Sequence, residues 1–274
     1  MNEISIPKQE HKPRILAIAN QKGGVGKTTT TVNLATALAA VGKRVLIIDF
    51  DPQGNASTGL GIEHANRKYT SYDVVLNDVT LKEATQKTPV PNLFIVPATI
   101  DLTGAEIEMV SLMRREYRLK NAIDNGSEYY DYILIDCPPS LGLLTLNALT
   151  AANAILIPLQ TEFYALEGLS HLMRTISLVQ GALNPELSIQ GIVLTMYDRR
   201  NKFTEQIERD VRGYFGDQVY QSVIPRNIRM SEAPSHGKPA LIYDMHCAGS
   251  KAYIALASEL LKREKQFKKE MTAA

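Results

Sequence analysis

The sequence predicts an α/β protein with a doubly wound, mostly parallel sheet that is covered by helices on both faces. From residue 14 onward, short runs rich in Ile, Val and Leu alternate with segments that have the apolar period of a helix. The strand candidates contain few charged residues, which is typical of strands buried on both faces of a parallel sheet. The first strand candidate runs directly into a glycine-rich loop and then a helical segment, an order that recurs in open α/β sheets.

The expected elements follow this alternation along the chain. The strand candidates are residues 15–19, 45–49, 93–97, 132–136, 154–158, 189–195 and 219–224. The helix candidates are residues 28–41, 103–124, 143–151, 166–183, 204–215 and 249–269. Because no repeat and no Pro/Gly-rich linker divides the chain, we expect a single domain over residues 14–274 that ends in a C-terminal helix. A flexible N-terminal arm is expected over residues 1–13.

The bulk composition is that of an ordinary globular protein, with 274 residues of which 45% are hydrophobic and 22% charged. The formal net charge is +1, so only a local basic patch could indicate nucleic-acid binding. Cys137 and Cys247 lie far apart in the sequence, which disfavours a disulfide framework and fits a reducing cytosol. Residues 1–12 lack the apolar core of a secretory signal, and no stretch approaches the ~20 apolar residues that span a bilayer.

The glycine-rich loop has the composition of a phosphate-binding site. Glycines let the backbone curl so that successive N–H groups point at phosphate oxygens, and the following helix adds the positive end of its dipole. Lys27 can reach the β- and γ-phosphates of a nucleotide, and the Thr28 hydroxyl is placed to ligate Mg²⁺. The candidate phosphate-binding residues are Lys22, Gly23, Gly24, Val25, Gly26, Lys27, Thr28 and Thr29.

The loop departs from the standard Walker A pattern at two neighbouring positions. Gln21 stands where the pattern has its first glycine, and Lys22 adds a second cation upstream of Lys27. The string from Lys22 to Thr28 resembles the deviant Walker A motif of the ParA/MinD superfamily of P-loop NTPases. The resemblance implies that Lys22 reaches the phosphates of a facing subunit in an ATP-sandwich dimer, where it would act like an arginine finger.

Two strand candidates end in aspartates that can complete a nucleotide site. Ligands of open α/β sheets bind beyond the carboxyl ends of the strands, where Asp49, Asp51 and Asp136 are expected. A lone aspartate there could equally cap a turn, but two such ends beside a phosphate loop favour a metal site. Asp136 follows an apolar strand candidate as in a Walker B motif and would hold Mg²⁺ through a water. Residues 49–55 resemble the ParA switch I region, which implies that Asp51 orients the attacking water and Asp49 supports the Mg²⁺ site.

The resemblance to ParA-type partition ATPases extends from residue 14 to about residue 262. It includes residues 231–239, which are very similar to the chromosomal ParA/Soj branch. Residues 138–142 resemble a switch II loop, which couples the γ-phosphate to the dimer face. By the same resemblance, Pro225 frames the adenine with its apolar ring and its carbonyl, and Asn227 hydrogen-bonds the edge of the base.

Basic residues gather late in the sequence, although acidic residues are interleaved with them. From the sequence alone, a solvated charged face explains them as well as a DNA site does. The resemblance favours DNA, because Arg200 and Arg229 align with arginines that ParA-type proteins use to hold DNA phosphates. Without aromatic stacking platforms or a helix-turn-helix motif, binding to double-stranded DNA is expected to be non-specific and sensitive to salt.

The resemblance implies a slow, Mg²⁺-dependent ATPase that forms a homodimer when it binds ATP and then associates with nucleoid DNA in the cytoplasm. A ParB-type centromere-binding protein would stimulate hydrolysis and release the dimer, which would drive segregation. The sequence leaves open whether a chromosome or a plasmid is segregated.

Three other functions within the superfamily compete with this interpretation. A MinD-like membrane-positioning ATPase would carry an amphipathic C-terminal anchor, but residues 262–270 have no apolar stripe, so no membrane association is expected. A relative with a shared Fe–S cluster would need paired cysteines, and Cys137 and Cys247 form no Cys-x-x-Cys motif. A non-enzymatic nucleotide sensor is the third alternative. An active ATPase is favoured over it by the complete set of Lys22, Lys27, Thr28, Asp51 and Asp136.

Overall fold

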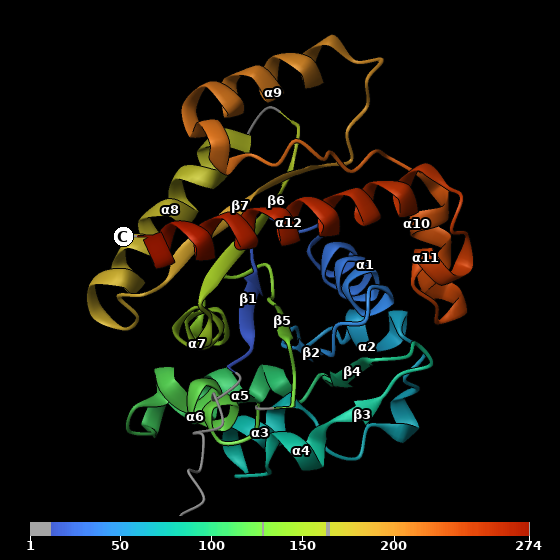
Figure 1. Cartoon of the computed structure of the whole chain (residues 1–274). Coiled ribbons are helices and arrows are strands. Elements are labelled where there is room, and N and C mark those ends of the chain that lie inside the picture. The colour runs from blue at the N-terminus through green and yellow to red at the C-terminus, as the bar shows by residue number, and fades with distance from the viewer. Residues whose placement is uncertain (1–11, 128, 163–164, 274) are drawn as a thin grey trace, which may run out of the picture.

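In the described part of the chain, seven strands form one sheet, and helices cover both of its faces (Figure 1). The structure is a computed structural model that describes residues 12–127, 129–162 and 165–273, with side chains up to residue 266. The strands are β1 (Arg14–Ile18), β2 (Val45–Asp49), β3 (Gln86–Lys87), β4 (Leu93–Val96), β5 (Tyr132–Asp136), β6 (Ala154–Gln160) and β7 (Ser188–Thr195).

The strand order is β3-β4-β2-β5-β1-β6-β7, and every neighbouring pair is parallel except β3 and β4. β1 lies in the middle of the sheet between β5 and β6. The loop that follows β1 therefore emerges beside the carboxyl ends of both neighbours, where ligands of open α/β sheets bind. The predicted doubly wound, mostly parallel sheet is confirmed.

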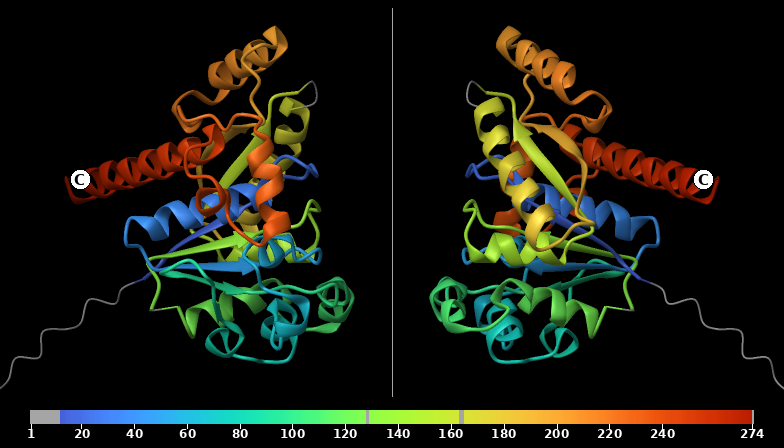
Figure 2. Two further views of the ribbon diagram at one scale, coloured as in Figure 1. Left: turned by 90° about the vertical axis from the view of Figure 1, so that its right-hand side faces the viewer. Right: turned by 90° about the vertical axis from the view of Figure 1, so that its left-hand side faces the viewer.

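Two helical layers pack on the sheet, and Figure 2 shows them from either side. One layer consists of α1 (Lys27–Ala40), α2 (Asn55–Gly59), α10 (Ile228–Glu232), α11 (Ala240–Tyr243) and α12 (Ala248–Ala273). The other consists of α3 (Ser71–Leu76), α4 (Leu81–Ala84), α5 (Leu102–Glu108), α6 (Arg118–Asp124), α7 (Leu143–Ala151), α8 (Ala165–Ala182) and α9 (Lys202–Phe215).

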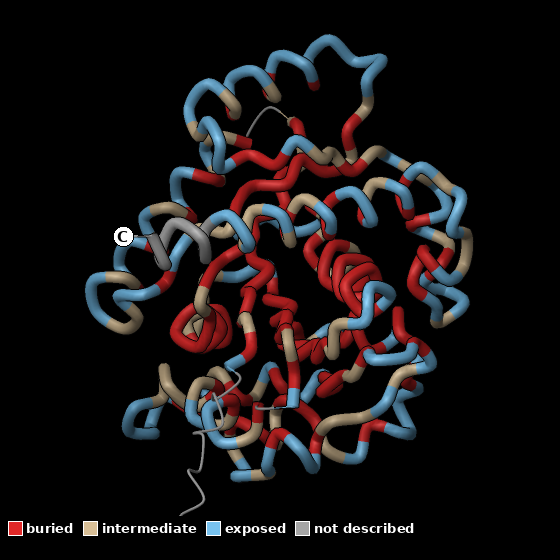
Figure 3. Tube along the Cα trace, viewed as in Figure 1, coloured by how far each residue is buried: buried red, intermediate tan, exposed pale blue. Residues whose placement is uncertain are grey.

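The core on each face follows from the two-residue period of the strands. In β5, Ile133 and Ile135 belong to the core under the second helical layer, and Leu134 belongs to the core under the first. α1 is buried along almost its whole length because it lies next to the sheet and α12 covers it (Figure 3). The helix that follows the glycine-rich loop is therefore embedded in the core.

The prediction of a strand over residues 219–224 is wrong. The segment runs beside β7, and the Tyr220 and Ile224 amides donate to β7 carbonyls, but it makes only isolated bridges. The amides of Gln221 and Ser222 instead donate to the Glu259 carboxylate of α12, both at 2.9 Å. The Glu259 side chain thus takes the Ser222 amide, which would donate to β7 in a continuous ladder.

The single helix expected over residues 103–124 is also wrong, because the structure divides it between α5 and α6. The helical path ends at Leu112, whose backbone is extended with ψ 140°, and Arg114 has a left-handed backbone with φ +54° just before the chain becomes helical again. The buried side chain of Asn147 in α7 stabilises the break, since it donates to the Arg115 carbonyl at 2.9 Å and accepts from the Leu119 amide at 3.2 Å. The short edge strand β3 was not predicted.

Two sequence expectations concern the ends of the chain. Residues 1–11 of the expected N-terminal arm lie outside the described residues, as do the side chains of residues 267–270 in the charged C-terminal segment. Among the residues that the structure describes, no helix combines the length and apolar character needed to cross a bilayer.

Candidate nucleotide-binding site

The loop between β1 and α1 has the backbone of a phosphate cradle. Gly24 and Gly26 have φ angles of +76° and +86°, in the left-handed region where a side chain would be strained. Gly26 directly precedes α1, which begins at Lys27. The first turn of a helix has N–H groups without intrahelical partners, and here that turn opens onto the loop. Anionic oxygens fit this position.

Two strands anchor the loop at the edge of the sheet. The Asn20 side chain donates to the Pro158 carbonyl in β6 at 2.7 Å and accepts from the Lys22 amide at 3.0 Å. The Thr195 hydroxyl at the end of β7 donates to the Val25 carbonyl at 2.8 Å. The position of the loop is therefore set by strands that the chain reaches much later.

The Lys27 side chain turns back across the loop. Its ammonium donates to the carbonyl of Lys22 at 2.9 Å, and the residue is buried. Burial lowers the pKa of Lys27, and the negative charges of Asp136 and Asp51 oppose this shift. An ammonium has three donors, so Lys27 can bind a phosphate oxygen while it keeps the loop closed.

The Lys22 side chain takes a different direction. Its ammonium forms an ion pair with the carboxylate of Glu162, which lies just beyond β6. The side chains of Lys22 and Glu162 are 45% and 31% exposed, so the pair sits at the rim of the site in contact with solvent. The two lysines of the motif are thus separated, with Lys27 inside the loop and Lys22 on its outer edge.

Asp136, at the end of β5, has a buried carboxylate with one unsatisfied oxygen. Thr31 of α1 donates to Oδ1 at 3.0 Å, while Oδ2 is buried and has no hydrogen-bond partner among the described residues. Burial and the nearby Asp49 carboxylate raise the pKa of Asp136, against hydrogen bonds from Thr28 and Thr31 that lower it. A buried oxygen without a partner is costly, and a cation with oxygen ligands would satisfy it.

Asp49, at the end of β2, pairs in register with Asp136. Its Oδ2 accepts hydrogen bonds from the Ser57 amide at 2.8 Å and the Ser57 hydroxyl at 2.6 Å, and its Oδ1 accepts from the Asp51 amide at 3.4 Å. Burial raises the pKa of Asp49 in spite of these bonds. The carboxylate therefore anchors α2 and the turn that carries Asp51.

Asp51 begins the turn between β2 and α2. It is buried, and its Oδ1 accepts from the Gln53 amide at 3.0 Å. The charges of Asp51 and Asp136 both act on the pKa of Lys27, so the three groups share one electrostatic environment. The structure brings the predicted catalytic and metal residues together at the carboxyl edge of the sheet.

The segment 138–142 links the phosphate loop to α5. A Cβ atom built on Gly23 would lie 3.9 Å from the Cβ atom of Pro139. Farther along, the Leu144 amide at the start of α7 donates to the Glu106 carboxylate of α5 at 3.3 Å. The segment 138–142 therefore lies between the phosphate loop and the contact of α7 with α5.

A cavity of about 310 Å³ opens beside the loop, and Pro225 and Asn227 line it together with Gly26, Thr29 and Tyr253. The Asn227 carboxamide oxygen accepts from the Arg229 amide at 2.9 Å and so caps α10. The amide nitrogen of this side chain remains available as a donor to a base. A second cavity of about 260 Å³ shares the wall formed by Thr29, Met230 and Pro234.

Comparison with known proteins assigns the chain to a family. A family model described as an AAA domain (AAA_31) matches residues 13–189. Over 256 residues the chain is 60% identical to the chromosome partitioning protein ParA of Caulobacter vibrioides, covering 92% of this chain and 95% of that protein. The chain belongs to the ParA/Soj family of chromosome-partitioning ATPases.

A second relative agrees with this assignment, and a solved structure of a protein with a different name shares the fold. The sporulation initiation inhibitor protein Soj of Bacillus subtilis is 55% identical over 247 residues, which cover 90% of this ParA/Soj-family chain and 98% of Soj. A solved structure of cobyrinic acid a,c-diamide synthase from Mycobacterium smegmatis, with bound ADP and magnesium, has a TM-score of 0.81. It is 38% identical and covers 93% of this chain and 96% of its own.

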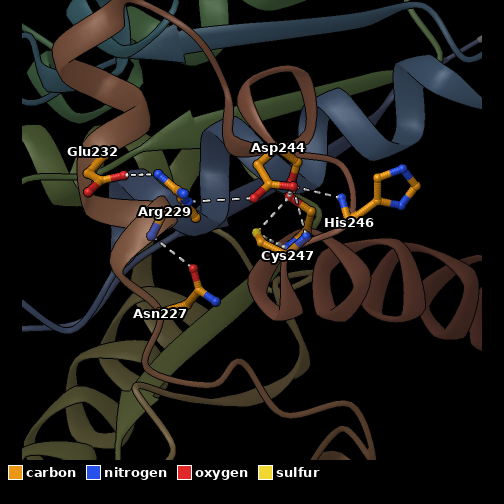
Figure 4. Close-up of polar contacts among 7 residues, drawn as sticks. Asn227, Arg229, Glu232, Asp244, His246 and Cys247 are labelled. Atoms are coloured by element: carbon orange, nitrogen blue, oxygen red, sulfur yellow. Dashed lines mark hydrogen bonds and ion pairs between the residues drawn. The ribbon is translucent and has the colours of Figure 1, made fainter.

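The two arginines predicted to bind DNA lie outside the nucleotide cradle and are both paired within the chain. Arg200 is 89% exposed and forms two hydrogen bonds with the Asp198 carboxylate at 2.9 and 2.8 Å. Arg229 contacts Glu232 at 2.8 Å and Asp244 at 3.6 Å, as Figure 4 shows. Both guanidinium groups remain accessible, but each carries a neighbouring negative charge.

Sequence reasoning missed several residues that shape the site. Glu162 and Asn20 follow strands, as the predicted aspartates do, and this position was the available signal for them. The other missed residues had no signal in the sequence, because each contacts a residue far along the chain. Thr31 contacts Asp136, and both Ser57 and Arg67 contact Ala98.

Proposed function

We propose that this ParA/Soj-family protein is a partition ATPase in which ATP binding with Mg²⁺ produces a homodimer that associates with nucleoid DNA. The observation that carries the proposal is the opposite placement of the two loop lysines. Lys27 lies within the cradle, whereas Lys22 lies on the rim and is half exposed. A cation on the rim is suited to neutralise the phosphate charge of the nucleotide that a facing subunit binds.

The site residues are proposed to share the work on one nucleotide. The phosphate loop and Lys27 bind the triphosphate, and the cavity at Pro225 and Asn227 receives the base. Thr28 and Asp136 would hold Mg²⁺, which when bound neutralises charge on the phosphates. The unsatisfied Oδ2 of Asp136 supports this assignment.

Hydrolysis is proposed to depend on Asp51 and Lys22. Asp51 orients the attacking water, because its carboxylate is buried close to Lys27 and its turn is fixed by the Asp49 carboxylate. The partner subunit contributes its own copy of Lys22, which stabilises the charge that develops on the transferred phosphoryl group. The protein is expected to turn over slowly without a stimulating partner.

The DNA-bound dimer is proposed to be the active form in segregation. Arg200 and Arg229 of both subunits would contact DNA phosphates, so the dimer engages two weak sites at once. A ParB-type centromere-binding protein would stimulate hydrolysis and release the dimer. Residues 14–274 are proposed to act as one domain in this cycle.

The proposal is tested by measuring binding to random-sequence duplex DNA with ATP, with ADP and without nucleotide, each at two salt concentrations. Tight binding is expected only with ATP, and it should weaken at the higher salt concentration. Equal binding in all three nucleotide states would contradict the nucleotide-controlled dimer. Pelleting with liposomes of anionic lipids is the control for a MinD-like function, and the ATP-bound protein should stay in the supernatant.

A further inference from the structure

Arg67 lies buried under the turn that carries Asp51. Its side chain makes four hydrogen bonds, all to neutral oxygens. Nε and Nη2 donate to the Ile62 carbonyl at 3.1 and 2.9 Å, and Nη1 donates to the Ala98 carbonyl at 2.8 Å. Nη2 also donates to the Thr58 hydroxyl at 2.9 Å. One side chain therefore joins α2, the segment after it and the segment that follows β4.

The guanidinium of Arg67 is buried, but all the acceptors of its hydrogen bonds are neutral. Burying a charge is expensive, and the usual remedy is a carboxylate partner. Burial lowers the pKa of Arg67. The negative charge of Asp49 raises it, but this effect is the smaller of the two. A guanidinium has five donors in a rigid planar fork, which can fix several carbonyl groups relative to one another.

The guanidinium is in direct contact with the turn. Gly54 has φ +60°, and a Cβ atom added to it would lie 2.5 Å from Nη1 of Arg67 and 2.8 Å from the Ala98 carbonyl oxygen. The Thr58 hydroxyl that accepts from Arg67 donates in turn to the Gly54 carbonyl at 3.1 Å. The Gly54 amide donates to the Asp51 carbonyl at 2.9 Å. A continuous path of contacts thus connects Arg67 with Asp51.

α2 is held between two buried charges of opposite sign. Asp49 binds the amide and hydroxyl of Ser57 on one side, and Arg67 binds Thr58 on the other. Ala98 takes part in both contacts, since its amide donates to the Ser57 hydroxyl at 3.1 Å and its carbonyl accepts from Arg67. A helix this short has little stability of its own, so these contacts determine where it lies.

We propose that Arg67 is a positioning residue for ATP hydrolysis, which holds the turn from Asp51 to Gly54 in place and so sets the position of the Asp51 carboxylate. The inference rests on the proposed function, in which Asp51 orients the attacking water. Arg67 itself lines neither of the two cavities beside the phosphate loop. Its loss should therefore affect the chemical step and leave nucleotide binding intact.

The test compares Arg67→Lys and Arg67→Gln with the wild-type protein. We expect kcat for ATP hydrolysis to fall about 10- to 100-fold, because a displacement of ~1 Å at a reacting group has an effect of this size. KM for ATP, affinity for a non-hydrolysable ATP analogue and analogue-induced dimerisation should stay at wild-type values. Arg118→Gln is the matched control, since Arg118, at the start of α6, also donates to a carbonyl, that of Val75 in α3, and pairs with Asp78.

Thr58→Val provides an independent variant, because it removes the hydroxyl between Arg67 and Gly54 without changing a charge. It should also lower kcat at unchanged KM, and the double variant Thr58→Val/Arg67→Gln should be less impaired than the two separate effects predict. If Arg67→Gln fails to fold, Arg67→Lys and Thr58→Val decide the matter by the same measurements.

The inference is overturned if folded Arg67 and Thr58 variants retain the wild-type kcat, or if kcat falls only in proportion to the folded fraction measured by circular dichroism. It is also overturned if KM and analogue affinity change as much as kcat does. Failure of the proposed function would look different, because the wild-type protein itself would then hydrolyse no ATP.

Discussion

Lys22 and Glu162 form an ion pair within a single chain, at the rim of a site where Lys22 is proposed to serve a second subunit. The pair therefore has to open before the Lys22 ammonium can cross to a partner. Because both side chains are partly exposed, the attraction between them is weak and can be exchanged for a phosphate contact.

Breaking the pair from the Glu162 side should favour the dimer. We expect Glu162→Gln to tighten ATP-dependent dimerisation about two- to fivefold, since an exposed ion pair of this strength no longer competes for Lys22. Light scattering across a protein concentration series with a non-hydrolysable analogue measures the effect. Glu186→Gln, an exposed substitution before β7, is the control and should leave the dimer unchanged. Weaker dimerisation in Glu162→Gln would show that the carboxylate assists the dimer.

Removing the Lys22 ammonium should have the opposite effect. Lys22→Ala is expected to keep some ATP binding, because Lys27 and the loop backbone remain, but to lose ATP-dependent dimerisation and hydrolysis. Nucleotide binding by fluorescence and dimerisation by light scattering separate the two functions. A Lys22→Ala protein that dimerises fully with ATP would refute the assignment of this lysine to the facing subunit.

Asp51→Ala should trap the ATP-bound dimer. Without the carboxylate the attacking water loses its orientation, and kcat should fall about 100-fold or more while ATP binding and dimerisation persist. The lifetime of the dimer after a chase with ADP, together with phosphate release, measures this outcome. Asp124→Ala on α6, whose partner is Lys120, is the control. Rapid turnover in Asp51→Ala would exclude the proposed role.

Asp136 and Asp49 should respond oppositely to mutation in the free protein. Asp136→Asn replaces an ionisable carboxyl, whose charged form burial disfavours, with a neutral amide and should raise the free energy of unfolding at neutral pH by roughly 1–3 kcal/mol in the absence of Mg²⁺ and nucleotide. Asp49→Ala removes the acceptor of two Ser57 hydrogen bonds and should lower it.

Denaturant titrations with and without Mg²⁺-ATP measure both effects. The additional stabilisation that Mg²⁺-ATP gives the wild-type protein should be lost in Asp136→Asn, because the proposed metal ligand is gone. An Asp136→Asn protein that is less stable than wild type without ligand, or that keeps the full Mg²⁺ effect, would argue against the metal site.

Arg200→Ala and Arg229→Ala should each weaken the affinity for DNA by the same factor for all DNA sequences. Each should also reduce the slope of log affinity against log salt concentration by the equivalent of about one phosphate contact per site. ATP hydrolysis should persist, because both residues lie outside the cradle. Arg229 also contacts Glu232 and Asp244, so the melting temperature of that variant has to be checked. Lys82→Ala on α4 is the control for a general loss of positive charge, because α4 leads into β3, at the opposite end of the strand order from β7 and Arg200. Unchanged DNA affinity in both arginine variants would remove the proposed surface.

Much of the fold could be predicted because the decisive signals are local. Buried parallel strands appear as short apolar runs, and the cores of β2 and β5 were placed correctly from them. The errors arose where a distant side chain redirected the backbone. Glu259 takes the amides of Gln221 and Ser222, and Asn147 stabilises the break before α6.

The sequence by itself determined the family, the sheet and the phosphate loop, because a contiguous motif between a strand and a helix has a single local geometry. Tertiary structure alone decided which residues support that motif. Glu162 reaches Lys22, and Arg67 reaches the Ala98 carbonyl beyond β4, only because parallel strands bring their carboxyl ends, and the loops beyond them, to one edge of the sheet. Contacts between segments so far apart in the chain depend on the completed fold and leave no periodic pattern in the sequence.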